Sequence, residues 1–90
     1  MEARAWRIRG RVQGVGFRWW TSRVAQRESL VGAVRNERDG SVVVEAWGAP
    51  EQLDALERLL RRGPTGARVD ALEPMPAPTR SAPGEFTIER

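Results

Sequence analysis

One short segment, GRVQGVGFR at residues 10–18, carries the residue types that an anion site needs. Gly14 and Gly16 permit backbone angles that other residues resist, so successive N–H groups can point into one concavity. Arg18 follows at the expected start of a helix, where its cation faces the positive end of the helix dipole. A bound phosphate would relieve that repulsion, and the guanidinium could grip it in two places. The same residues also fit a tight turn followed by a solvated arginine. However, a cation at the positive end of a helix dipole is locally unfavourable, and local rules tend to be broken at functional sites, so we favour a functional site.

Asn36, in the segment VRNERDG at residues 34–40, is a second candidate. It lies where a strand is expected to end beside a turn, and an asparagine there commonly bonds to its own backbone. Its amide group also offers a donor and an acceptor, which suits the placing of a water molecule. The spacing alone does not say whether Asn36 comes near the glycine-bearing loop, so both interpretations stay open at this point.

The composition excludes several kinds of chemistry. The 90 residues include no histidine, cysteine, lysine or tyrosine. An imidazole base, a thiolate nucleophile, a Schiff-base amine and the usual zinc ligand sets are therefore excluded. All 15 basic residues are arginine, against 12 acidic residues, which gives a formal net charge of +3. That balance favours an anionic partner without choosing between nucleic acid and a small phosphate.

The patterns around these residues predict five strands and two helices. Residues 4–12 alternate between apolar positions and arginines, which is typical of a half-buried strand. Leu53, Leu56 and Leu60 repeat at the spacing of one helix face, and the dipeptide Asp-Gly at 39–40 indicates a hairpin turn. The predicted strands cover residues 4–12, 31–37, 41–47, 67–75 and 86–90, and the predicted helices cover residues 19–30 and 50–62.

The order of these elements predicts the fold class. The order β-α-β-β-α-β-β contains the split βαβ arrangement of ferredoxin-like folds. We expect an α+β sandwich, βαββαβ with an added fifth strand, in which two helices cover one face of a mostly antiparallel five-stranded sheet. The other face of the sheet is expected to lie open to solvent. The length, without a linker or an internal repeat, predicts a single domain over residues 1–90.

Nothing in the sequence predicts export or membrane insertion. No apolar run approaches the ~20 residues that a membrane span needs, and the first ten residues lack the apolar core of a signal peptide. Because cysteine is absent, no disulfide can form, and we expect the protein to act in the cytoplasm.

The sequence resembles the acylphosphatase family. The likeness is carried by GRVQGVGFR at residues 10–18 and VGAVRNERDGSVVVEAWG at 31–48, and it extends to GPTGARVDALE at 63–73 and FTIER at 86–90. It covers the chain from about residue 5 to the last residue. The resemblance implies the ferredoxin-like sandwich. It also implies hydrolysis of small acyl phosphates to a carboxylate and inorganic phosphate, without a metal or an organic cofactor.

The resemblance further implies roles for individual residues. Arg18 matches the family's phosphate-binding arginine, and Asn36 matches its water-orienting asparagine. The implied phosphate-binding loop consists of Gln13, Gly14, Val15, Gly16, Phe17 and Arg18. Ala33 stands where relatives often place a tryptophan, and the bulky pair Trp19-Trp20 also departs from the family pattern. We expect these departures to affect packing or the pocket rim, and we expect a monomer with no nucleic-acid or membrane partner.

Two other functions fit parts of the sequence. A split βαβ sheet can bind RNA when aromatic side chains on its first and third strands stack on bases. Only Trp6 and Trp47 are available for this, and packing is the simpler role for both. The chain could also resemble a domain of a larger carbamoyl-transfer enzyme, but its 90-residue length favours a separate protein.

Overall fold

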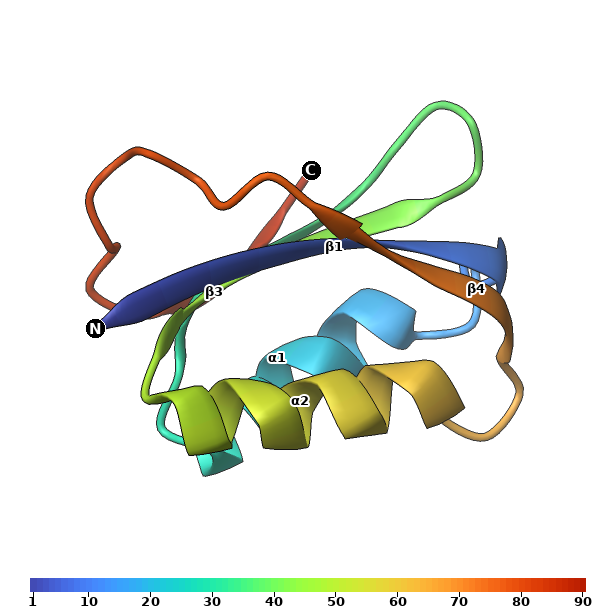
Figure 1. Cartoon of the computed structure of the whole chain (residues 1–90). Helices are drawn as coiled ribbons and strands as arrows, with labels where there is room; N and C mark the ends of the chain where they lie inside the picture. Colours follow the sequence, from blue (N-terminus) through green and yellow to red (C-terminus); the bar gives the residue numbers. More distant parts are fainter.

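The chain forms five strands and two helices in the predicted order. They are β1 (Glu2–Arg11), α1 (Phe17–Arg27), β2 (Val31–Asn36), β3 (Val42–Gly48), α2 (Pro50–Arg62), β4 (Arg68–Met75) and β5 (Phe86–Glu89). The structure is a computed structural model that describes residues 1–90. The strands form one sheet in the order β4-β1-β3-β2-β5, in which only the pair β2 and β5 is parallel. The predicted ferredoxin-like α+β fold with a fifth strand is confirmed (Figure 1).

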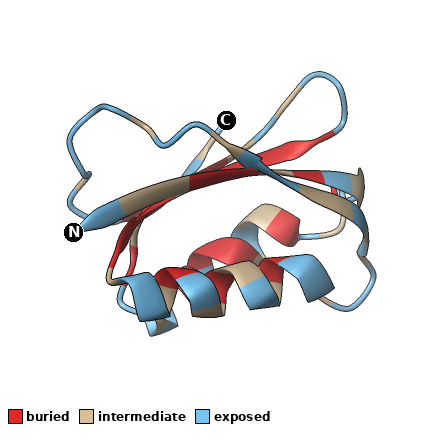
Figure 2. Ribbon diagram, viewed as in Figure 1, coloured by how far each residue is buried: buried red, intermediate tan, exposed pale blue.

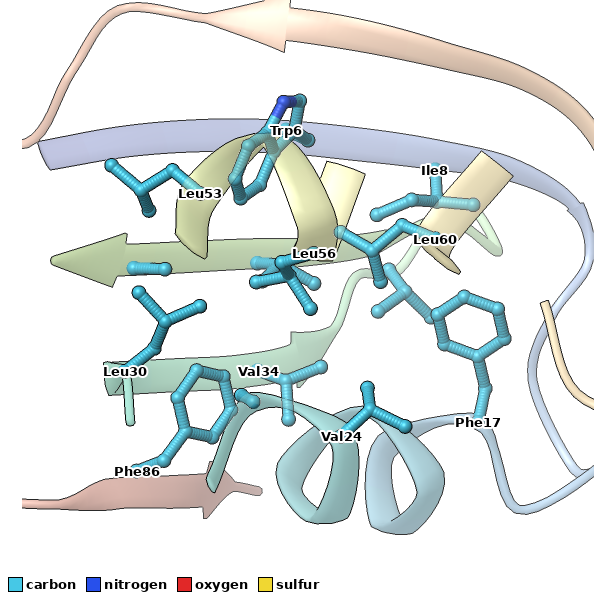
Figure 3. Close-up of a cluster of buried hydrophobic side chains, with 14 of the residues drawn as sticks. Trp6, Ile8, Phe17, Val24, Leu30, Val34, Leu53, Leu56, Leu60 and Phe86 are labelled. Carbon is cyan, nitrogen blue, oxygen red and sulfur yellow. The ribbon is translucent and has the colours of Figure 1, made fainter. Parts of the chain in front are cut away.

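The hydrophobic core lies between the sheet and the two helices, which cover the same face. Leu53, Leu56 and Leu60 of α2 are fully buried, as their spacing predicts, and Trp6 and Ile8 of β1 belong to the same cluster (Figure 3). Figure 2 shows the buried residues of the helices on the sides that face the sheet. Both helices are too short and too polar to span a bilayer. The amphipathic pattern of each element therefore positions the helices over the sheet.

The other face of the sheet is less exposed than the sequence predicts. Four residues on this face are buried, namely Ala5, Ala33, Val43 and Trp47. The connection between β4 and β5 crosses on this side (Figure 1), and its Arg80 donates a hydrogen bond to Glu45 at 2.6 Å. The same guanidinium lies over the Trp47 ring, 5.3 Å from its centroid. The expectation of an open face is therefore wrong, because a long connection covers part of it.

The burial of the two tryptophans also bears on RNA binding. Trp6 is 1% exposed and points into the core, where its indole N–H donates to Glu57 at 3.0 Å. Trp47 is 5% exposed under Arg80. Neither ring is available for stacking on a base, so the structure gives no support to an RNA-binding sheet.

The β2–β3 hairpin is held in shape by a short hydrogen-bonded turn. Asp39 accepts hydrogen bonds from the backbone N–H of Ser41 at 3.0 Å and from its hydroxyl at 2.6 Å. These bonds, with a smaller contribution from Arg9, lower the pKa of Asp39 to about 2. The carboxylate is thus ionised at neutral pH, and its support of the turn is lost only as the pH falls from about 4 toward 2.

The side chain of Gln13 ties the loop after β1 to this hairpin. Its amide nitrogen donates to the carbonyl oxygens of Glu37 at 2.8 Å and of Ser41 at 2.9 Å. These two carbonyls lie on either side of the turn, and the backbone N–H of Glu37 donates to the Ser41 carbonyl at 2.8 Å. One side chain therefore fixes the glycine-bearing loop against the end of β2.

Replacement of Gln13 by alanine should destabilise the protein by about 1–3 kcal/mol, because two hydrogen bonds to half-buried carbonyl oxygens are lost, although each oxygen keeps one backbone N–H donor. Gln13→Glu should be at least as harmful at pH 7, because a carboxylate cannot donate and would repel both oxygens. Urea unfolding followed by circular dichroism measures these changes. Gln26→Ala, at an exposed position in α1, is the matched control and should change stability by less than about 0.5 kcal/mol. Equal stability of the Gln13 and Gln26 alanine variants would show that the tie is not structural.

Candidate functional site

Two glycines shape the loop that leads into α1. Gly14 and Gly16 have φ values of 75° and 78°, in the left-handed region that favours glycine. A Cβ atom added at either position would meet nothing within 4 Å. The glycines are therefore needed for the backbone angle and not for lack of space. The open volume above them leaves the backbone accessible to a ligand.

The start of α1 concentrates positive charge. Gly16 is the N-cap, no side chain caps the helix, and the first turn contains no acidic residue. The first N–H groups of a helix have no partner within it, and they carry the positive end of the dipole. The helix begins at Phe17, two residues earlier than predicted, because the left-handed Gly16 turns the chain into the helix and Phe17 is buried in the core. Arg18 is thus the second residue of the helix.

A contact with β5 orients the Arg18 side chain. Its guanidinium donates to the backbone carbonyl oxygen of Glu89 at 3.1 Å. One donor of the fork is thereby engaged by the sheet edge. The half-buried side chain lines the cavity, and its other N–H groups form no hydrogen bond within the protein and are available for an anion.

Strand pairing brings Asn36 to the same place. Asn36 is the last residue of β2, and Arg35 beside it pairs with Glu89 of the parallel strand β5. The end of β2 therefore lies next to the carbonyl that receives Arg18. Arg18 and Asn36, 18 positions apart in the sequence, line one cavity of about 230 Å³. The question that the spacing left open is answered, since Asn36 lies close to the glycine-bearing loop and lines the same cavity.

The cavity includes some of the predicted residues and adds others. Its lining residues are Val12, Gly14, Gly16, Phe17, Arg18, Trp19, Asn36, Ile88 and Arg90. Gln13 and Val15 of the predicted loop do not line it. The side chain of Gln13 is bonded to the hairpin, and Val15 packs against the core. Val12, Ile88 and Arg90 were not predicted. The register of β5 against β2 places Ile88 there, and Arg90 follows directly after the strand; the sequence has no local signal for that register.

The charge of the cavity suits a small anion. Its nine lining residues include two arginines, Arg18 and Arg90, and no carboxylate side chain. The volume lies below the roughly 300–1,000 Å³ of pockets for drug-sized ligands, so a small molecule fits better than a nucleotide. Backbone N–H groups, a guanidinium and an asparagine amide can together bind a phosphate-sized group and a water molecule. Nowhere in the structure do three acidic, histidine or cysteine side chains gather in a way that could hold a metal ion.

Comparisons with known proteins identify the family of the chain. A family model described as acylphosphatase matches residues 4–88 of the chain. The chain is 50% identical to an acylphosphatase from Mesorhizobium japonicum over 82 residues, which cover 91% of this chain and 87% of the relative.

Two solved structures show the same fold. The crystal structure of an acylphosphatase from Bacillus subtilis superimposes with a TM-score of 0.89 at 30% identity, over 100% of both chains. A structure of HypF from T. kodakarensis matches with a TM-score of 0.83 at 30% identity, over 100% of this chain but only 12% of that one. The likeness that the sequence motifs indicate is confirmed over nearly all of the chain, which therefore belongs to the acylphosphatase family.

Proposed function

We propose that the protein is an acylphosphatase enzyme that hydrolyses small acyl phosphates to a carboxylate and inorganic phosphate. One observation carries this proposal: Arg18 and Asn36 line the same small cavity, at the exposed start of a helix entered through two left-handed glycines. Membership of the family supports the reaction class. The proposed enzyme works as a single chain in the cytoplasm and needs no metal, organic cofactor or nucleic acid.

The proposed phosphate site consists of the backbone from Gln13 to Arg18 together with the Arg18 guanidinium. The unpaired N–H groups at the helix start face developing negative charge on the phosphoryl oxygens. The guanidinium adds donors in a planar fork that matches two oxygens of a phosphate. Phosphoryl transfer asks mainly for positioning and for electrostatic stabilisation of this kind, with little covalent help from the protein.

Asn36 is the proposed water-positioning residue. Its amide can accept one hydrogen bond from the water and donate another, which holds the water oxygen in line with the phosphorus atom. The water oxygen then bonds to phosphorus while the bond between phosphorus and the acyl oxygen breaks. The acyl oxygen leaves with the electron pair as a carboxylate, which needs little protonation. The water's proton passes to a phosphate oxygen, so no histidine or other strong base is required.

Hydrolysis of benzoyl phosphate at neutral pH in the presence of EDTA tests the reaction class directly. We expect release of one benzoate and one phosphate for each molecule consumed, at a rate that EDTA does not change. No hydrolysis above the spontaneous rate would contradict the proposed activity. A rate abolished by EDTA and restored by a divalent cation would contradict the proposed metal-free mechanism.

Substitutions at the two central residues test their roles. Arg18→Ala and Asn36→Ala should each lower kcat by about 100- to 1,000-fold, the usual effect of removing one preorganised donor. Arg18→Lys should also lose most activity, because an ammonium group does not reproduce the fork. Arg27→Ala, at an exposed position in the last turn of the same helix, is the matched control and should retain activity. Near-wild-type turnover of Asn36→Ala would rule out its role in placing the water.

A further inference from the structure

Exposed apolar side chains gather at the mouth of the cavity. Besides Met1, the only large hydrophobic side chains exposed at the surface are Trp19, at 60%, and Ile88, at 39%. Both line the cavity that also contains Arg18 and Asn36. Isolated exposed apolar residues need no explanation, but two from different elements that line the same cavity as two arginines indicate a ligand with both an anionic and an apolar part.

The two side chains come from different elements that line the cavity. Trp19 follows Arg18 in the first turn of α1. Ile88 pairs in register with Val34 in the parallel strands β5 and β2, and Asn36 lies two residues beyond Val34 on the same face of the sheet. Ile88 and Asn36 therefore face the helix side of the sheet together, and the apolar wall adjoins the proposed water-positioning residue.

A cation packs over the Trp19 ring. The Arg23 guanidinium carbon lies 5.0 Å from the centroid of this ring, one helical turn further along α1. Such a contact restrains an indole that would otherwise rotate freely in solvent. A large ring that is restrained in this way offers contact area at a reduced cost in conformational entropy.

We propose that Trp19 and Ile88 form a subsite for the acyl group and give this protein a preference for aromatic acyl phosphates over acetyl phosphate. The inference rests on the proposed function and deepens it. An acyl phosphate has an anionic phosphoryl end and an acyl end, and the cavity offers polar groups for the first and apolar side chains for the second. Arg18, Asn36 and the loop backbone face the phosphoryl group, while the indole and the isoleucine contact the acyl chain. An aromatic acyl group gains most, because it can pack against the indole.

Binding of two phosphonates, measured by calorimetry, tests the subsite without any turnover. At a pH high enough for both ligands to be dianions, phenylphosphonate and methylphosphonate carry the same anionic head, so the ratio of their Kd values reports the contact made by the apolar group. We expect the wild type to bind phenylphosphonate about fivefold more tightly, and Trp19→Ala to reduce that ratio to less than about twofold. Trp19→Phe, which keeps a ring, should retain an intermediate ratio. Trp20→Phe is the matched control, because the half-buried Trp20 ring packs on Phe17 and does not line the cavity. The ratio of the two Kd values should be the same in this variant as in the wild type.

Kinetics with benzoyl phosphate and acetyl phosphate complete the test. The ratio of kcat/KM for the two substrates should fall in Trp19→Ala and in Ile88→Ala, mainly through KM for benzoyl phosphate. A wild-type phosphonate ratio near one, or a ratio unchanged in Trp19→Ala, would overturn the subsite. A protein that hydrolyses neither acyl phosphate but shows the expected phosphonate ratios keeps the subsite and loses the proposed function.

Discussion

The arrangement of the site depends on the concentration of positive charge at the uncapped start of α1. The N–H groups of this first turn have no partner in the helix, no side chain caps them, and Arg18 adds a further cation. An arrangement of this kind is locally unfavourable in the absence of an anion. The fold tolerates this unfavourable arrangement because the surrounding elements hold the first turn of α1 and Arg18 in position.

Contacts with the core, the hairpin and β5 fix the position of the loop and the first turn of α1. The left-handed Gly16 turns the loop into the helix, and the buried Phe17 anchors the first turn in the core. Gln13 ties the loop to the β2–β3 hairpin, and the Glu89 carbonyl on β5 orients Arg18. The parallel pairing of β2 with β5 places the end of β2 beside that carbonyl. The site is therefore assembled from segments that are distant in the sequence and fixed by backbone groups of the sheet, which is consistent with precise positioning.

Local patterns predict those parts of the fold that depend on local physics. The alternation in β1, the leucine stripe of α2 and the Asp-Gly turn of the hairpin each correspond to an element at the expected place. The proximity of Arg18 and Asn36 depends on strand pairing, and sequence spacing carries no information about it. The same is true of Ile88, whose place in the cavity follows from the register of β5. The sequence does not predict that the connection between β4 and β5 covers part of the outer face of the sheet. This proline-containing connection has no hydrophobic periodicity that would indicate where it packs.

Thermal unfolding with added inorganic phosphate tests most directly whether the start of α1 is built for a phosphoryl group. At roughly ten times its Kd, phosphate should raise the Tm of the wild type by about 5–10 °C, because only the folded chain binds it. Sodium chloride at equal ionic strength separates this effect from charge screening. Arg18→Ala should start from a Tm close to or above that of the wild type and respond to phosphate much less. An equal rise in both proteins, or no rise in the wild type, would contradict a phosphate site at this helix start.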